Sequence, residues 1–140
     1  MTINNSNLQQ IKTNLTGLNS KLLIVTKNQN IDDIKSLIDG GHKLFGENKV
    51  QEAKKKFQFF KSDNINLHLI GPLQTNKVKD ALKIFDTIQT VDRDKLVDAV
   101  NKELKKNKIY KTKEFFIQIN IGGENQKSGI SKKKVKDFYD

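Results

Sequence analysis

The sequence contains no cysteine or tryptophan, and it has a single proline among its 140 residues. The absence of cysteine excludes disulfide bonds and thiolate metal sites. No apolar run approaches the roughly 20 residues that a membrane-spanning helix requires, and the polar start lacks the apolar core of a secretion signal. We therefore expect a cytoplasmic protein. A chain of this length can bury about two-thirds of its unfolded surface, so we predict one domain over residues 1–140.

Arginine is also scarce, because Arg93 is the only one in a chain whose lysines produce a formal net charge of +10. A large positive charge is typical of nucleic-acid binding. Sequence-specific readout, however, relies on the two-pronged guanidinium of arginine, and the lysines here are spread over several amphipathic segments. We interpret most of them as a solvated surface, so nucleic acid is an unlikely partner.

Short apolar segments alternate with amphipathic ones along the chain. An opening helix is expected at residues 6–18, and five strands follow, at residues 22–26, 42–46, 65–71, 86–91 and 114–121. Each strand is followed by a helix, and these helices are expected within residues 30–41, 47–61, 73–85, 93–107 and 131–140. Three polar residues are predicted as helix N-caps, namely Asn30, Asp92 and Ser131.

Strict alternation of strands and helices indicates a parallel sheet, which leaves a doubly wound sheet or a (β/α) barrel as candidates. The first strand is not followed by G-x-G-x-x-G, and G-x-x-x-x-G-K-[ST] occurs nowhere in the chain. These are the usual signatures of nucleotide-binding open sheets. We therefore predict an α/β fold, a partial TIM-type barrel with about five of its eight strand–helix units.

The fifth predicted strand divides its side chains between two faces by period-two geometry. We expect one set to face the helices: Phe115, Ile117, Ile119 and Ile121. The other set is expected to point into the barrel: Phe116, Gln118 and Asn120. The second set becomes polar toward the C-terminal end of the strand, and this indicates a site there.

Polar residues follow every predicted strand at the point where the strand ends. They are Lys27, residues 46–48, residues 71–77, Asp92 and residues 120–129. In (β/α) barrels the loops at this edge build the functional site.

Three segments resemble successive signatures of the YggS-like pyridoxal phosphate homeostasis proteins, which are related to the N-terminal barrel of alanine racemase. The segments read IVTKNQNIDDIKSLIDGGHKLFGENKVQEA, HLIGPLQTNKVK and IQINIGGENQKSGIS. They occur in the family's order and spacing, and the resemblance runs from about Leu22 to the last residue. It implies a protein that binds pyridoxal 5′-phosphate.

The resemblance implies that Lys27 matches the lysine that holds this cofactor as an internal aldimine. Only an uncharged amine attacks an aldehyde, so we expect the side chain to be poorly hydrated in the barrel mouth. Without the resemblance, a lysine that reaches solvent from a strand end would be the ordinary interpretation.

The resemblance also assigns four other residues to the cofactor site. Asn48 matches an asparagine beside the cofactor ring, and Gln118, Asn120 and Lys127 match the fifth-strand block. Lys127 is either a second amine that helps to hand the cofactor on or a lysine of the loop surface.

Other polar residues keep two interpretations each. Glu47 is either a site residue or a first-turn acid of the following helix. His68 is more often a core histidine than a proton shuttle in such a pattern. Gln74, Asn76 and Lys77 either shape the barrel mouth or cap a helix.

The family's C-terminal segment, with the strands that hold the cofactor phosphate, has no counterpart in these residues, and a complete barrel takes about 250 residues. The chain therefore resembles a family member truncated at the C-terminus. We expect unpaired edges on the first and fifth strands, self-association or completion by another chain, and weak cofactor binding.

The resemblance implies a non-catalytic role in intracellular cofactor homeostasis, in which apo-enzymes receive the cofactor. The alternative is a pyridoxal phosphate-dependent enzyme of the amino-acid racemase type. That enzyme would need a second acid–base group, for which Lys127 and His68 are the candidates.

Overall fold

The computed structural model describes residues 3–60, 64–106, 109–124 and 126–139. Five strands of this part form one parallel sheet in the order β1-β2-β3-β4-β5. They are β1 (Ile24–Val25), β2 (Leu44–Glu47), β3 (Asn66–Leu69), β4 (Thr87–Val91) and β5 (Glu114–Ile117). A doubly wound sheet reverses its strand order at a switch point, whereas a barrel adds strands in sequence. The sheet therefore confirms the prediction of a partial barrel of the α/β class.

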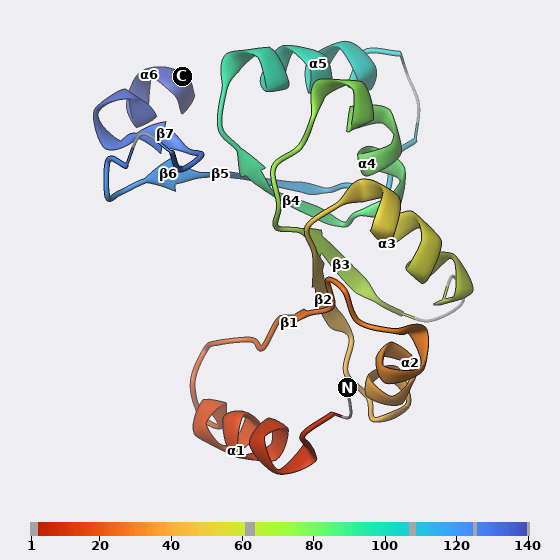
Figure 1. The fold of residues 1–140 in the computed structure, drawn as a ribbon. Coiled ribbons are helices and arrows are strands. Elements are labelled where there is room, and N and C mark those ends of the chain that lie inside the picture. Colours follow the sequence, from red (N-terminus) through yellow and green to blue (C-terminus); the bar gives the residue numbers. More distant parts are fainter. Residues whose placement is uncertain (1–2, 61–63, 107–108, 125, 140) are drawn as a thin grey trace.

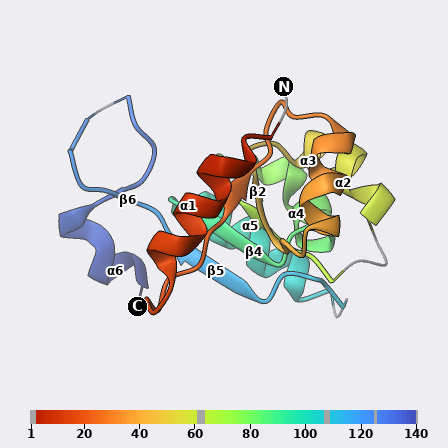
Figure 2. The same cartoon turned by 90° about the horizontal axis from the view of Figure 1, so that it is seen from below.

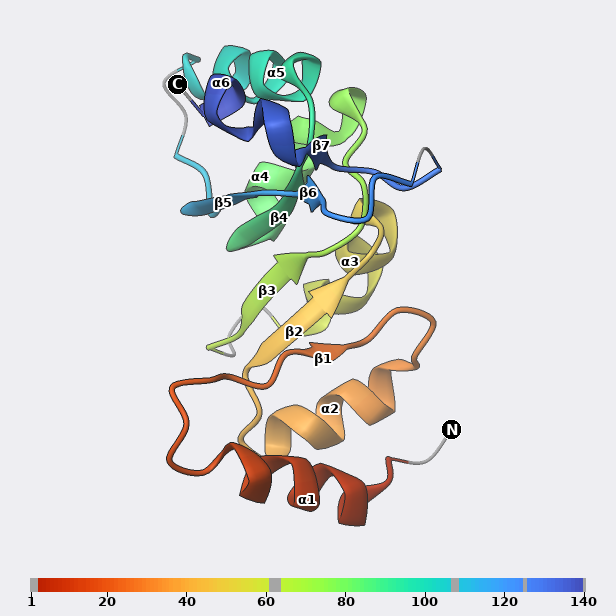
Figure 3. The ribbon, with the colours of Figure 1, turned by 90° about the vertical axis from the view of Figure 1, so that its left-hand side faces the viewer.

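Four of the helices in the described residues cover one face of this sheet, and the other two lie at its ends (Figure 1 and Figure 3). The helices are α1 (Asn5–Leu15), α2 (Ile31–Asp39), α3 (Val50–Phe57), α4 (Val78–Ile84), α5 (Asp94–Leu104) and α6 (Val135–Tyr139), with 3₁₀ helices η1 (Gln58–Phe60), η2 (Thr75–Lys77) and η3 (Lys132–Lys134). Helices α2 to α5 lie on the same side of the strands, as right-handed crossovers require (Figure 1). Helix α1 lies beyond β1 at one end, and α6 lies beyond β5 at the other (Figure 3).

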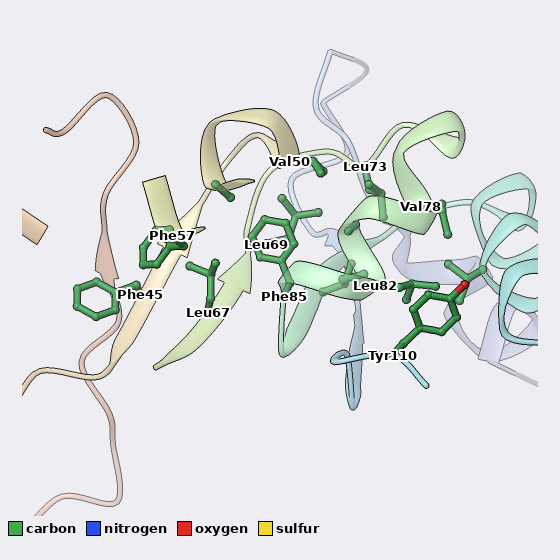
Figure 4. Packing of buried hydrophobic residues seen from close by; sticks show 14 of the residues in the cluster. Phe45, Val50, Phe57, Leu67, Leu69, Leu73, Val78, Leu82, Phe85 and Tyr110 are labelled. Atoms are coloured by element: carbon green, nitrogen blue, oxygen red, sulfur yellow. The ribbon is translucent and has the colours of Figure 1, made fainter. Parts of the chain in front are cut away.

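The hydrophobic core fills the space between the sheet and its helices (Figure 4). Phe45 of β2, Leu67 and Leu69 of β3 and Ile88 of β4 are at most 1% exposed. They occupy alternate strand positions on the helix-covered face. Each fully buried side chain of this kind stabilises the fold by roughly 1.5–3 kcal/mol. The opposite face of the sheet, which would be the inside of a barrel, is the face on which the site residues are expected.

Two of the three predicted N-caps make no side-chain cap bond. Asn30 does cap α2, since its Oδ1 accepts from the Asp33 N–H at 2.7 Å. Arg93 occupies the N-cap position of α5, so the assignment of Asp92 was wrong. The Asp92 carboxylate instead pairs with Arg93 Nη1 at 2.5 Å, while Arg93 Nη2 donates to the Leu73 carbonyl at 2.7 Å. Ser131 occupies the N-cap position of η3, as predicted, but its side chain makes no cap bond.

The predicted strand over residues 114–121 is in fact two strands. β5 ends at Ile117, and β6 (Ile119–Asn120) pairs with β7 (Ile130–Ser131) in a separate two-stranded sheet. The chain turns away at Gln118, whose N–H donates to the Val91 carbonyl at 2.9 Å and whose carbonyl accepts from the Ile130 N–H at 2.8 Å. β6 and α6 consequently lie to one side of β5 (Figure 2).

This split changes the two faces predicted for the fifth strand. Phe115 pairs in register with buried Ile88, so it lies on the helix-covered face as expected, although it is 38% exposed. Ile119 and Ile121 do not face the helices, because they lie beyond the five-stranded sheet and are 40% and 84% exposed. The predicted ends of three helices, at residues 61, 107 and 140, lie outside the described residues.

None of the helices in the described ranges has the length and apolar character needed to cross a bilayer.

Candidate functional site

The C-terminal ends of all five parallel strands meet at one edge of the sheet, and this edge carries the candidate site. Val25 pairs with Gly46, and the N–H of Thr26 still donates to the Gly46 carbonyl at 2.9 Å. Lys27 and Asn48 are each the second residue beyond this pair, so they follow the C-terminal ends of two neighbouring strands.

The Lys27 side chain is exposed, whereas Asn48 is half-buried. The expectation that the Lys27 amine is poorly hydrated was therefore wrong. Lys27 follows Thr26, the buried residue directly after β1, and the next residue, Asn28, has a φ of 59°. A positive φ turns the chain sharply, and the Gln29 N–H closes this turn on the Thr26 carbonyl at 3.0 Å.

Asn48 is held against the end of β3 by a glycine. A Cβ atom at Gly71 would lie 2.2 Å from the Asn48 carbonyl oxygen and 2.7 Å from its Cα. No side chain fits there, so Gly71 lets the loops after β2 and β3 approach directly. The Ile70 N–H also donates to the Glu47 carbonyl at 2.9 Å, which extends the β2–β3 pairing up to the site.

Behind Lys27 lies a buried ionic cluster, which we define as Thr26, Glu47, Glu52 and Lys56. Glu47 Oε1 accepts from Thr26 Oγ1 at 2.7 Å and from Lys56 Nζ at 3.1 Å. Lys56 Nζ also donates to Glu52 Oε1 at 2.6 Å and to the Thr26 carbonyl at 2.7 Å. Lysine has three donors, and here each has an acceptor.

Burial and charge act differently on the two carboxylates of this cluster. Burial raises the pKa of Glu47, although hydrogen bonds from Thr26 and Lys56 oppose the shift. The hydrogen bond from Lys56 lowers the pKa of Glu52. A positive charge at Lys56 therefore faces a negative charge at Glu52, with Glu47 wholly enclosed between α3 and the sheet.

The interpretation of Glu47 as a first-turn acid of the following helix was wrong. Glu47 is the last residue of β2, and its side chain points to α3 instead of lying in the first turn of that helix. Sequence reasoning missed Lys56 altogether. Two signals were present: Lys56 is four residues after Glu52, and it follows Ala53 at the spacing of the buried face of α3.

The other three predicted site residues form a second group near β6. Gln118, Asn120 and Lys127 line a cavity of about 330 Å³ together with Ile70 and Pro72. Lys127 Nζ pairs with Glu124 Oε1 at 2.5 Å, and Asn120 Nδ2 donates to the Glu124 carbonyl at 2.9 Å. An exposed ion pair of this type stabilises little, so the Lys127 amine can exchange partners readily.

The structure thus brings the predicted residues to one edge of the sheet in two groups. Lys27 and Asn48 form the first, and they are not among the residues that line the cavity of the second. The segment from Ile70 to Pro72 connects them, since it adjoins Asn48 through Gly71 and lines the cavity.

His68 is a buried residue of β3 on the sheet face opposite the core. It is 8% exposed, and its Nδ1 lies 2.7 Å from Gln89 Nε2. Burial lowers the pKa of His68. Its Nε2 has no hydrogen-bond partner among the described residues. His68 is therefore buried and hydrogen-bonded at one nitrogen, on the face that would be the inside of a barrel and not in the core beneath the helices.

The segment after β3 makes no side-chain cap. Gln74 precedes η2 and Lys77 precedes α4, each without a side-chain cap bond, and Gln74 and Asn76 are exposed. The capping interpretation of Gln74 and Lys77 was therefore wrong.

Comparison with curated proteins finds relatives with one shared name. The chain is 43% identical over 120 residues to the pyridoxal phosphate homeostasis protein of Pasteurella multocida, covering 84% of this chain and 51% of that protein. It is 44% identical over 117 residues to the protein of the same name from Haemophilus influenzae, covering 82% and 48%. The chain thus spans about half the length of these relatives. No model of a protein family matches the chain.

Solved structures lead to the same group of proteins. PipY of Synechococcus elongatus, solved without PLP, superimposes with a TM-score of 0.83 at 25% identity, covering 94% of this chain and 60% of PipY. PipY solved with PLP bound gives a TM-score of 0.65 at 31% identity over 73% of this chain and 48% of PipY. The predicted resemblance to the pyridoxal phosphate homeostasis proteins is therefore confirmed, in sequence and in fold, over about half the length of those proteins.

Proposed function

We propose that this chain binds pyridoxal 5′-phosphate and takes part in intracellular homeostasis of that cofactor, with residues 1–140 forming one incomplete barrel domain. The similarity to proteins named for this role supports the proposal, as does the PLP-bound structure of PipY. The observation in the structure that supports it is that Lys27 and Asn48 follow the C-terminal ends of neighbouring parallel strands, each two residues beyond the Val25–Gly46 pair.

The donor set at this edge fits the chemistry of the cofactor. Bound pyridoxal phosphate supplies an aldehyde, whose carbon can form a C=N bond to the Lys27 nitrogen while its oxygen leaves as water. The Lys27 side chain is exposed and so accessible to an incoming molecule. The amide of half-buried Asn48 can donate a hydrogen bond to an oxygen on the cofactor ring.

The second group of residues, near β6, is suited to releasing the cofactor. Gln118 and Asn120 contribute amides to the wall of the 330 Å³ cavity, and Lys127 contributes an amine. We assign Lys127 the task of receiving the cofactor from Lys27 before apo-enzymes take it up. Its single recorded partner, Glu124, holds the amine at the cavity without burying it.

We propose that the protein performs this task without catalysis. A racemase-type enzyme needs two acid–base groups at the cofactor. The two candidates for these groups lie apart: Lys127 lines the cavity near β6, whereas His68 of β3 is not among the residues that line it.

Self-association through strand edges belongs to the same proposal. β1 and β5 are the two ends of the sheet, and each carries exposed apolar side chains, such as Val25 at 43% and Phe116 at 47%. Nucleic acid stays an unlikely partner, and a cytoplasmic location stays a prediction from the sequence.

The test is the absorbance spectrum of the protein after incubation with pyridoxal phosphate, followed by borohydride reduction and peptide mapping. Wild type is expected to gain a near-visible band that borohydride bleaches, with the adduct on Lys27. Lys27→Ala should lose the band, whereas Lys21→Ala, an exposed lysine before β1, should keep it.

Two outcomes would count against the proposal. A wild-type protein without the band does not bind the cofactor through an amine. Measurable turnover of an amino acid, lost on Lys27→Ala, would favour the racemase-type enzyme instead.

A further inference from the structure

The ionic cluster of Thr26, Glu47, Glu52 and Lys56 holds the backbone on both sides of Lys27. On the N-terminal side, the Thr26 carbonyl accepts from Lys56 Nζ at 2.7 Å, and Thr26 Oγ1 donates to Glu47 at 2.7 Å. On the C-terminal side, the Asn28 N–H donates to Glu52 Oε1 at 2.6 Å. The same Glu52 oxygen accepts from Lys56 Nζ.

These bonds connect the turn after β1 to α3, which is a different element of the barrel. Lys56 and Glu52 are one helical turn apart on α3, while Glu47 comes from the end of β2. Within the described segment 26–28, Thr26 and Asn28 bond to the cluster and Lys27 does not, and the Lys27 side chain is exposed. The cluster therefore fixes the backbone on both sides of Lys27 and leaves the Lys27 amine accessible.

Stability alone does not account for such a cluster. The Glu47 side chain is 0% and the Lys56 side chain 11% exposed, so both charged groups have lost most of their hydration. Apolar residues of similar volume commonly stabilise a fold as well as a buried ion pair does. Directional bonds, by contrast, define where a backbone lies, because their strength depends on angle as well as distance.

We propose that Lys56 and Glu52 are positioning residues that set the direction and reactivity of the Lys27 amine through the backbone of Thr26 and Asn28. This inference rests on the proposed function, in which the Lys27 amine binds the cofactor. It adds that α3, through two side chains that need not touch the cofactor, decides how well Lys27 reacts.

The experiment compares four variants of the full chain. Glu52→Ala removes the acceptor for the Asn28 N–H, whereas Glu52→Gln keeps a carbonyl oxygen at that position. Lys56→Met removes the donor to the Thr26 carbonyl and retains an unbranched apolar stem. Lys55→Met is the matched control, because Lys55 is the exposed neighbour on the same helix.

Two readouts separate the two proposals. One is the rate of borohydride-trapped attachment of pyridoxal phosphate to Lys27. The other is the pH profile of Lys27 acetylation by a small anhydride, followed for each lysine by mass spectrometry, which needs no cofactor. Thermal unfolding of each variant records any loss of stability.

Glu52→Ala and Lys56→Met are expected to slow attachment at Lys27 by about 10- to 100-fold and to change its acetylation profile, since a reacting group misplaced by about 1 Å can lose about 100-fold in rate. Glu52→Gln should stay within about twofold of wild type, and Lys55→Met should match it. If Lys27 is acetylated in Glu52→Ala and Lys56→Met with the same pH profile as in wild type, the positioning role is refuted, even if the unfolding temperatures of these variants fall. If wild type attaches no cofactor but Glu52→Ala still changes the acetylation profile of Lys27, only the proposed function is refuted.

Discussion

Gly71 sets the distance between the loops after β2 and β3 by having no side chain. The backbone of Asn48 occupies the place where a Cβ atom would lie, with its carbonyl oxygen 2.2 Å away. Backbone atoms cannot rotate aside as a flexible side chain can. The close approach of Asn48 to the loop after β3 therefore depends on this glycine.

Gly71→Ala is accordingly expected to destabilise the fold by about 1–3 kcal/mol, the usual cost of overpacking. Urea unfolding measures this difference. Gly122→Ala is the control, because a Cβ there would meet only the flexible side chain of Glu124, at 3.2 Å, and the free energy of unfolding should change by less than about 0.5 kcal/mol. Equal stabilities for Gly71→Ala and wild type would show that the Asn48 loop moves without cost.

His68 makes stability depend on pH at the acidic side of neutrality. Burial lowers its pKa, so the unfolded chain binds the proton more tightly than the folded chain. The contribution of His68 is therefore complete above the unfolded pKa of about 6.5 and is lost as pH falls from there toward the lower folded pKa.

The unfolding temperature of wild type should thus fall as pH drops below about 6.5, and His68→Gln should reduce that fall. Burial also lowers the pKa of His42, so His42→Gln is the control. This variant should keep the part of the fall in unfolding temperature that His68 causes. Calorimetry across this pH range measures both slopes. Identical slopes for wild type and His68→Gln would show that His68 is not the group responsible.

Helices α1 and α2 have the same type of cap but a different share in the fold. Asn4 Oδ1 accepts from the Asn7 N–H at 3.0 Å, and Asn30 Oδ1 accepts from the Asp33 N–H at 2.7 Å. α2 buries Ile34 and Leu37, whereas α1 has no buried residue. The same hydrogen bond should therefore matter globally in α2 and only locally in α1.

Asn30→Ala is expected to lower the free energy of unfolding by about 1 kcal/mol. Asn4→Ala should leave global unfolding almost unchanged and instead accelerate amide hydrogen exchange within α1, because that helix can open by itself. Urea unfolding and hydrogen exchange of both variants provide the comparison. Equal global losses in the two variants would mean that α1 unfolds together with the core.

At the scale of the whole molecule, the sheet ends at β1 and β5, where its helix-free face also carries apolar side chains. Phe116 alternates with Phe115 and therefore lies on that face, 47% exposed. An open strand edge beside an apolar face favours pairing with another chain. This supports the proposed self-association.

Phe116→Lys should shift the protein toward the monomer in size-exclusion chromatography, since a charge at a strand edge opposes edge-to-edge pairing. Phe59→Lys is the control, because Phe59 is 63% exposed but belongs to η1 after α3, away from the sheet edge. A compact, cooperatively unfolding wild-type monomer would contradict the prediction.

The amino-acid sequence by itself determined the order of strands and helices, the cap at Asn30 and the alignment of polar residues with strand ends. These features follow from local periodicity and from turn and cap chemistry, which act between residues close in the chain. The resemblance to the pyridoxal phosphate homeostasis proteins was also contained in three contiguous segments.

Only the tertiary structure decided the break of the fifth strand at Gln118, the Asp92–Arg93 pair in place of a cap, and the ionic cluster behind Lys27. Each involves a partner far away in the sequence. Lys56 Nζ donates to a carbonyl 30 residues away, and Gln118 bonds to the backbone of both Val91 and Ile130. Arg93 is adjacent to Asp92, but it also donates to the Leu73 carbonyl 20 residues away. The spacing of Lys56 from Glu52 and Ala53 is a local sign of its place on the buried face of α3. Its acceptors at Thr26 and Glu47, however, come from other elements, so these partners could be identified only from the folded chain.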